Sequence, residues 1–310
     1  FHADKYIIPS CFKICYNDNM NKLVSIAIPT FNCKKNLLEC LESIKKQTHK
    51  PIEIIVVDSF STDGTVEMAR KYATVYSYGR DPKEVHAFGA PYQRNYGAAK
   101  AKGEYFYWLD SDMLLPPDLI ETCVRELESQ KADAIIIPEL SVGVSFWAQC
   151  RRLEKECYNQ SPHSYTDTAR FMKRKIWETL GGIDPQLGGA DDFDLQIKLD
   201  KNGYKTIKIK KAVLHNEGNL TLKKQLTKKF VYGKTMLGYF KKHRKEKERL
   251  GQQFALIRPE FLQNFDLLAK DPFHAVGMIT MKFLEYTAGF LGLVYGLLKK
   301  EKVEVYETNH

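Results

Sequence analysis

Short apolar runs alternate with amphipathic segments through the first third of the chain, and this alternation limits the fold more than any other feature. Residues 23–28 and 52–58 are apolar and rich in β-branched side chains, and a segment with helical apolar spacing at 37–44 lies between them. Asn36 is predicted to cap that helix. A second helical segment at about 66–72 precedes a short strand at 74–78. Strand and helix in turn are typical of βαβ units and a parallel sheet, so we expect an α/β fold.

An aromatic run at 105–109, reading YFYWL, stops at two carboxylates, Asp110 and Asp112, with Ser111 between them. A short apolar run before a polar break predicts a central strand that is covered on both faces. Ligands of open α/β sheets bind just beyond the carboxyl ends of such strands. Two carboxylates at that place can share a hard divalent cation, and the cation can hold a diphosphate. The plainer alternative is a solvated turn that follows a strand.

Basic residues are concentrated between positions 205 and 250. This stretch contains fifteen Lys or Arg and three Glu, a formal charge of +12 in a chain whose total is +9. Such a block attracts polyanions, which include phosphates, nucleic acid and anionic membrane surfaces. The alternative is a solvated helix face.

Residues 273–298 differ from the basic block because they contain only two charged side chains, Lys282 and Glu285. These two can pair on a helix, since they are three residues apart. The apolar part after Glu285 is shorter than the about 20 residues that a spanning helix needs. We expect an interfacial helix, or a helix buried against the domain or a partner chain. With the basic block, this predicts peripheral membrane contact through 221–300.

Cysteine usage and the start of the chain bear on the compartment. The seven cysteines form no C-x-x-C pair, and no secretory signal is visible before the first strand. Both observations favour a reducing compartment. We therefore expect a cytoplasmic protein at the cytoplasmic face of a membrane.

Four segments occur in an order and at a spacing that resemble one enzyme family. They read PTFN at 29–32, VVDSFSTDGT at 56–65, LDSDM at 109–113 and GGIDPQLGGADDFDL at 181–195. From about residue 23 to 234 the chain resembles the nucleotide-sugar glycosyltransferases of family 2. The resemblance implies the GT-A fold, with a Rossmann-like, mostly parallel central sheet flanked by helices. It divides the chain into an N-terminal extension, a transferase domain with nucleotide-binding and acceptor halves, and a basic, then apolar, helical C-terminal region: 1–22, 23–235 (23–112 and 113–235) and 236–310.

The resemblance also implies which side chains bind the donor sugar nucleotide. These are Pro29, Thr30, Asn32, Asp58, Asp63, Arg94, Asp110, Ser111 and Asp112. Asp58 ends a strand, where a carboxylate needs a donor such as a nucleobase N–H or, alternatively, caps the next helix. Arg94 beside a helix start suits phosphate oxygens, although a surface ion pair is the other interpretation. Asp110 and Asp112 are implied to hold Mg²⁺ or Mn²⁺, with His215 either a third ligand or a structural histidine.

Asp191-Asp192-Phe193-Asp194 stands where the family has E-D-x-D. Asp192 matches the general base, with Asp191 beside it in place of the longer Glu. Inverting transfer needs a carboxylate that takes the acceptor hydroxyl proton. The alternative is a doubled cap on the helix 193–199. Ser59 and Phe60 stand where the family often has D-G, which leaves the base, uracil or guanine, open.

We predict an inverting glycosyltransferase that moves a sugar from a UDP- or GDP-type donor to a glycan or lipid-linked acceptor. One alternative is a polyanion-binding protein, but a basic block does not explain the carboxylates, and we expect no nucleic acid as a partner. A sugar nucleotidylyltransferase would resemble others of its kind in a Gly-rich loop after the first strand, where this chain has PTFN. A catalytically silent GT-A scaffold is the third alternative, and only activity excludes it.

Overall fold

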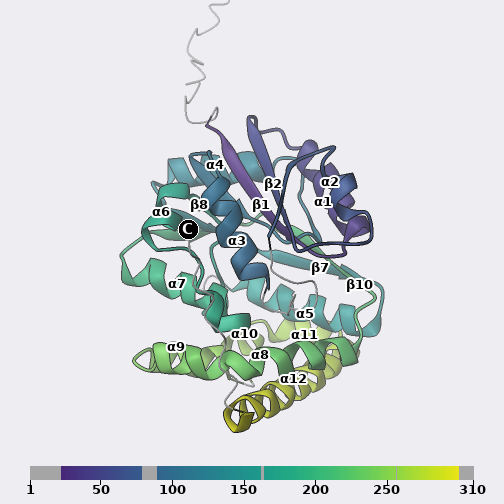
Figure 1. Cartoon of the computed structure of the whole chain (residues 1–310). Coiled ribbons are helices and arrows are strands. Elements are labelled where there is room, and N and C mark those ends of the chain that lie inside the picture. The colour runs from purple at the N-terminus through teal and green to yellow at the C-terminus, as the bar shows by residue number, and fades with distance from the viewer. Residues whose placement is uncertain (1–21, 79–88, 162–163, 256, 300–310) are drawn as a thin grey trace, which may run out of the picture.

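A computed structural model of the protein describes residues 22–78, 89–161, 164–255 and 257–299. Its centre is a seven-stranded sheet with the order β3-β2-β1-β4-β8-β6-β9, shown in Figure 1. These strands are β1 (Val24–Thr30), β2 (Ile52–Asp58), β3 (Thr74–Ser77), β4 (Tyr105–Trp108), β6 (Ala134–Ile136), β8 (Phe171–Lys173) and β9 (Thr206–Lys208).

The first four strands in the chain are mutually parallel, because β1 pairs in parallel with both β2 and β4, and β2 with β3. Only β8 among the strands of this sheet in the described residues runs the other way, antiparallel to β4 and to β6. The predicted α/β fold with a mostly parallel sheet is therefore confirmed.

Helices cover both faces of this sheet. The helices of the described residues are α1 (Lys34–Lys45), α2 (Thr65–Ala69), α3 (Gly89–Lys100), α4 (Leu119–Ser129), α5 (Phe146–Gln160), α6 (Arg174–Thr179), the 3-10 helix η3 (Pro185–Ala190), α7 (Asp191–Lys201), α8 (Leu222–Lys242), α9 (Lys247–Gln253), α10 (Pro259–Gln263), α11 (Phe265–Lys270) and α12 (Pro272–Lys299). Side chains of α1 and α4 form one core with the sheet, and those of α3, α6 and α7 form the core on its other face.

The central strand β4 is buried along its whole length, as its aromatic sequence predicts. Tyr105 and Tyr107 point into the core beside α1 and α4, whereas Phe106 and Trp108 point into the core beside α3 and α6. Helix α3 approaches the sheet closely through Gly97, where a Cβ would lie 2.8 Å from the Cβ of Ala27. This contact explains why the helix has a glycine at position 97.

A second, three-stranded sheet has the order β5-β10-β7 and lies beyond the end of β4. Its strands are β5 (Met113–Leu114), β7 (Glu139–Gly143) and β10 (Val213–Gly218). Met113 pairs with His215, and His215 pairs with Ser141. The residues that directly follow β4 are thereby fixed beside β10.

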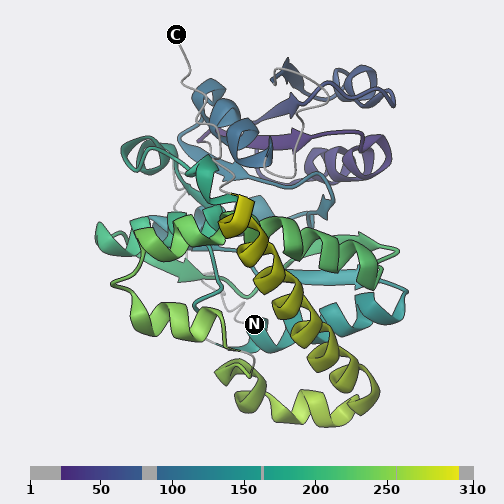
Figure 2. The same ribbon diagram turned by 60° about the horizontal axis from the view of Figure 1, so that its bottom comes forward.

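The C-terminal helices pack beneath the two sheets, and Figure 2 shows α12 crossing α8 on the outside of the molecule. The crossing is close because glycines lie at it: a Cβ at Gly292 would be 2.0 Å from the Phe230 carbonyl oxygen. The inner side of α12 also packs on α5, and Met278 and Met281 are buried there. Its outer side is exposed and apolar, with Phe273, Val276, Phe283, Phe290 and Leu298 among the exposed residues. Helix α12 is therefore both a packing element and an uncovered surface.

One expectation about local structure differs from the result. Asn36 does not cap α1, because the helix begins earlier, at Lys34, and Asp63 Oδ2 accepts a hydrogen bond from the Lys34 backbone N–H over 3.1 Å. A carboxylate from another loop therefore fills the role of the local cap. Helix α8 continues through residues 235 and 236, where the transferase domain is expected to end, and that division of the chain stays a prediction.

Candidate functional site

One cavity of about 690 Å³ opens at the carboxyl ends of β1 and β4 and extends to α5, α8 and α12. Nine of the twelve predicted site residues line it: Pro29, Thr30, Arg94, Asp110, Ser111, Asp112, Asp191, Asp192 and His215. These residues come from five elements and loops that are up to 186 positions apart in the chain. The cavity gathers them because parallel strands present their carboxyl ends at one edge.

The other three predicted residues, Asn32, Asp58 and Asp63, do not belong to the described cavity lining. Asp58 Oδ1 accepts from Thr30 Oγ1 over 3.0 Å, and Asp58 Oδ2 accepts from the Ser61 backbone N–H over 2.8 Å. Asn32 Oδ1 accepts from the Thr62 N–H over 2.8 Å. These side chains fasten the loops after β1 and β2 to each other, so that they shape the edge of the cavity. Their predicted contact with the donor stays a prediction.

Asp110 lies between two arginines. Arg94 Nη2 donates to its Oδ1 over 2.5 Å, and Arg170 Nη1 donates to its Oδ2 over 2.9 Å. Both guanidinium groups stack on the ring of Trp108, 4.5 and 4.4 Å from its centroid. Burial alone would raise the pKa of Asp110, but the charges of Arg94 and Arg170 reverse this and hold it below the usual value. Asp110 is therefore a carboxylate whose charge is fully compensated by the protein.

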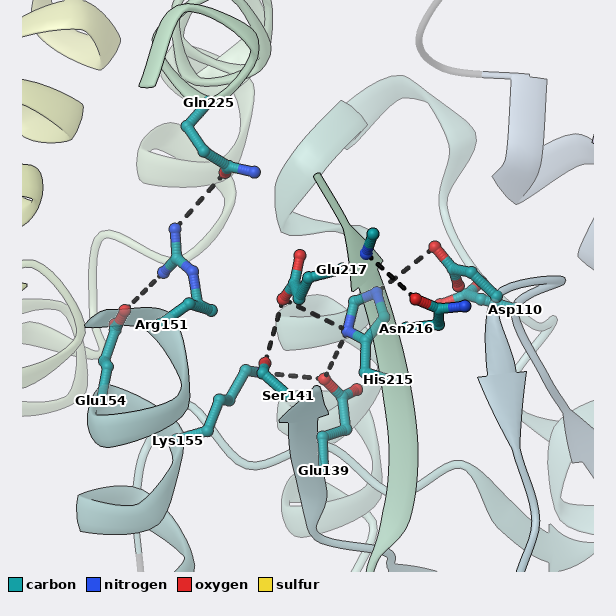
Figure 3. A network of polar contacts seen from close by, with 12 residues as sticks. Asp110, Glu139, Ser141, Arg151, Glu154, Lys155, His215, Asn216, Glu217 and Gln225 are labelled. Atoms are coloured by element: carbon teal, nitrogen blue, oxygen red, sulfur yellow. Dashed lines mark hydrogen bonds and ion pairs between the residues drawn. The ribbon is translucent and has the colours of Figure 1, made fainter. Parts of the chain in front are cut away.

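The two arginines extend this pairing into a chain of alternating charges. Arg94 Nη1 lies 3.3 Å from Asp191 Oδ2, and Arg170 pairs with Glu139 on the other side. Figure 3 shows Glu139 next to His215, whose Nδ1 lies 3.6 Å from the Glu139 carboxylate. His215 Nε2 in turn lies 3.3 Å from Asp112 Oδ2. A charge added at one end, for example by a bound diphosphate, would change the electrostatic interactions of all the linked groups.

Asp112 and His215 are the pair that fits a divalent metal best. Asp112 Oδ1 is buried and has no hydrogen-bond partner within the described part of the chain. A buried carboxylate oxygen without a donor is costly, and a cation satisfies it. Among the described residues no three His, Cys, Asp or Glu side chains gather closely enough to hold an ion alone. An ion at Asp112 would therefore need oxygen ligands from a substrate.

His215 is held as an imidazolium by the surrounding carboxylates. Burial favours its neutral form, but the hydrogen bonds and charges of Asp112 and Glu139 outweigh burial and raise the pKa of His215 to about 10. A metal ligand must be neutral, so binding of an ion at this histidine would displace a proton.

Asp191 and Asp192 begin helix α7 and line the cavity. Burial raises the pKa of Asp191, with the neighbouring charge of Asp192 adding to the effect and Arg94 opposing it. Burial likewise raises the pKa of Asp192, against the charges of Arg170 and Arg94. Carboxyl groups with a raised pKa are suited to proton transfer near neutral pH. Asp194 is different, because it is fully buried and accepts from His243 Nε2 over 2.8 Å.

Local packing fixes the start of α7. Asn95 exchanges two hydrogen bonds with the backbone of Ile183, at 2.7 and 3.0 Å, and thereby holds the segment before η3 against α3. Gly189 lies against Tyr232 of α8, and a Cβ there would be 2.2 Å from the tyrosine ring. Gly189 is therefore required by the approach of α8.

Sequence reasoning missed Arg170, Glu139 and the cavity-facing side of α8. Arg170 reaches Asp110 because its carbonyl oxygen accepts from the Trp108 N–H over 3.2 Å, next to the antiparallel pairing of β4 with β8. Nothing near position 170 signals that pairing, because its partner lies some 60 residues earlier in the chain. A spacing signal did exist in α8, where Gln225, Lys228, Lys229 and Tyr232 recur at helical intervals and all line the cavity.

Comparison with known proteins identifies the family. The sequence profile of Glycosyl transferase family 2 matches residues 25–181, which is just over half of the chain. The glycosyltransferase GlyG of Streptococcus pneumoniae serotype 4 is 37% identical over 117 residues, which cover 38% of this chain and 39% of GlyG. The chain thus spans about two fifths of that relative's length.

Two solved structures are similar in fold. The mannosyltransferase PcManGT from Pyrobaculum calidifontis, in complex with GDP-Man and Mn²⁺, has a TM-score of 0.59 at 20% identity, over 91% of this chain and 88% of its own. A TarS fragment from S. aureus in complex with UDP has a TM-score of 0.52 at 14% identity, over 90% and 92% of the two chains. The fold, the carboxylate cavity and the matching family profile lead to one conclusion: the chain belongs to glycosyltransferase family 2.

Proposed function

We propose that the protein is an inverting glycosyltransferase that takes a sugar from a UDP- or GDP-type donor. The observation that carries the proposal is that Asp192, a carboxylate with a raised pKa, lines the same cavity as Arg94 and Asp112. Inversion requires a base and a leaving-group site on opposite sides of the reacting carbon. The neighbours PcManGT and TarS support the choice of nucleotides, since they were solved with GDP-Man and UDP.

The roles of the individual side chains follow from their contacts. Asp192 would take the proton of the acceptor hydroxyl, while Asp191 and Arg94 hold its surroundings in place. Arg94 and Arg170 would bind diphosphate oxygens and stabilise the charge of the leaving nucleotide. Asp112 and His215 would hold a Mg²⁺ or Mn²⁺ ion, and Asp110, predicted as a further ligand, would orient the two arginines. Such an ion would neutralise charge on the diphosphate.

A donor screen tests this function. Thermal unfolding with Mn²⁺ should shift upward with either the UDP- or the GDP-sugars, since a ligand at 100 times its Kd stabilises by about 2.7 kcal/mol. Released nucleoside diphosphate should then be detected in the presence of an acceptor extract. Binding without any release would favour the silent scaffold. Release of pyrophosphate from a nucleoside triphosphate and a sugar phosphate would favour the nucleotidylyltransferase.

We also propose that the outer face of α12 binds the cytoplasmic face of an anionic membrane, where a lipid-linked acceptor would lie. Its exposed apolar side chains recur at helical spacing, and the basic residues Lys241, Arg244 and Lys245 are exposed at the end of the adjoining α8. An apolar face beside cations suits an interfacial helix on acidic lipids. In the described residues no helix is both long enough and apolar enough to cross a bilayer.

Liposome flotation tests the membrane contact with point variants. Phe283 and Phe290 are 56% and 63% exposed on α12, and replacing both by serine should abolish flotation with anionic vesicles while leaving the fold intact. Leu38→Ser is the matched control, because Leu38 is 37% exposed on α1, which lies at the other end of the molecule from α12 (Figure 1). Equal flotation of wild type and the double variant would end the membrane proposal.

A further inference from the structure

We call the part of the cavity lined by Arg94, Asp110 and Asp112 the donor end. Beyond it the cavity continues to a region between α5, α8 and α12 that holds more cations than carboxylates. Arg151, Lys229, Arg258 and Lys282 line this part, which we call the cationic end. Figure 3 shows Arg151 and Gln225 on one side of the Glu139–His215 network and Asp110 on the other. The cationic end is therefore distinct from the site of the proposed metal, yet part of the same cavity.

Two of these cations are neutralised by two carboxylates. Arg151 pairs with Glu154 and with Glu285, and Lys282 pairs with Glu154 and lies 3.8 Å from Glu285. All four side chains are at most 10% exposed. This cluster ties α5 to α12 and has no net charge left for a ligand.

Lys229 and Arg258 are the other two cations of the cationic end, and the two carboxylates of that cluster form no ion pair with them in the described residues. Within the described residues Lys229 makes no hydrogen bond and no ion pair, and it faces Glu285 and Lys282 of α12, Arg151 of α5 and Lys228 of α8. Arg258 Nη2 donates to the neutral Tyr286 hydroxyl over 3.0 Å, and its buried Nε has no partner in the part of the chain described. Arg258 is 6% exposed and Lys229 is partly exposed, so both cations have lost water contact without gaining a paired carboxylate in the described residues. Such a loss is costly, which points to an anionic ligand.

The pKa of the Lys229 amine reflects this shortage of negative charge. Burial is the main cause that lowers the pKa of Lys229 to about 8; the charge of Glu285 opposes it, and the cations Lys282, Arg151 and Lys228 act with it. An anion bound beside Lys229 would return the pKa toward the ordinary value of about 10.4.

Helix α8 aims its two adjacent lysines at different parts of the cavity. Lys228 lies in the field of Asp110, Asp112 and Glu217, at the donor end. Lys229 lies in the field of the α5 and α12 charges, at the cationic end. Because the donor diphosphate belongs with Arg94 and Arg170, an anion at Lys229 comes from the second substrate.

We propose that the cationic end binds a phosphate group carried by the acceptor, with Lys229 as its principal contact. Two uncompensated cations match a dianionic phosphate better than a singly charged carboxylate. The inference rests on the proposed transferase function, because it assigns this part of the cavity to the acceptor.

Isothermal titration with glycerol 3-phosphate tests the proposal, in the presence of Mg²⁺ and a saturating nucleoside diphosphate. Lys229→Met keeps the aliphatic chain and should weaken binding of this probe about tenfold, the effect of one charge-assisted hydrogen bond. Lys223→Met, an exposed lysine on the same helix, is the control and should bind like wild type. Lactate, the carboxylate probe, should bind neither wild type nor Lys229→Met measurably. Equal affinities of wild type and Lys229→Met, or preference for lactate, would overturn the proposal.

Two further readouts separate this test from protein folding and from the donor site. Lys229→Met should unfold at the same temperature as wild type or above it, because it removes a partly buried charge that has no ion-pair partner in the described residues. Clear destabilisation would indicate a structural role and contradict the proposal. Trace acetylation of wild type should show Lys229 titrating near pH 8, and glycerol 3-phosphate should move this midpoint upward. A midpoint that does not respond would contradict the proposal. Absence of nucleotide binding, by contrast, would count against the transferase function itself.

Discussion

Replacement of Asp192 by asparagine should lower sugar transfer by about 10²- to 10⁴-fold, the usual contribution of a general base. Nucleotide binding should stay close to wild type. Asparagine keeps the oxygen that accepts from the Phe193 N–H over 2.9 Å, so the start of α7 should hold its conformation. Initial rates with a saturating donor, together with the nucleotide Kd, measure the two effects separately.

The pH dependence of wild type provides a second measure of the same side chain. A base must be deprotonated, so activity should fall as the pH drops through the pKa of Asp192. Burial raises that pKa. The midpoint of the acidic limb of the pH–rate profile should therefore lie above about 3.9, the pKa of a free aspartate. Asp200→Asn, on the exposed end of the same helix, should keep the wild-type transfer rate and the wild-type acidic limb of the pH profile. Near-normal turnover of Asp192→Asn would show that the base is another residue.

Replacement of Asp112 by alanine should remove the metal-dependent part of nucleotide binding. Even residues that merely orient a metal ligand contribute about 10- to 100-fold to metal affinity, so loss of the ligand itself should cost about 10²-fold or more. The variant in Mn²⁺ should therefore bind nucleotide as weakly as wild type does in a chelator. Calorimetric titration of UDP and GDP under both conditions makes this comparison.

The matched control for this variant is Asp118→Ala. Asp118 is half exposed near the start of α4 and pairs with Lys211 on the surface, so its loss should leave nucleotide binding unchanged. A metal-dependent affinity that survives in Asp112→Ala would exclude this carboxylate as a ligand.

Local sequence pattern was sufficient for the parts of the fold that depend on neighbouring residues. The run at 105–109 is the buried central strand β4, and the carboxylates after it lie in the cavity, because apolar length and a polar break define such a strand. The start of α7 could be predicted for the same reason. The family pattern added Arg94 and His215, which no local rule singles out.

The other parts of the fold and of the site depend on pairings between segments that are distant in the chain. Arg170 enters the site through the antiparallel contact of β8 with β4, and Glu139 enters through β7 beside β10. Asp63 caps a helix that precedes it in the chain, which a search for local caps cannot find. The cationic end requires three helices to meet, and the sequence of any one of them shows only an ordinary charged face.

The central claim is that carboxylates from distant parts of the chain form one site for an activated sugar and its ion. Crystals grown with Mn²⁺ and the nucleoside diphosphate that binds, with data collected at the manganese absorption edge, test it directly. We predict one anomalous peak beside Asp112 and His215, with the diphosphate between it and Arg94. A peak elsewhere, or nucleotide bound outside this cavity, would contradict the account.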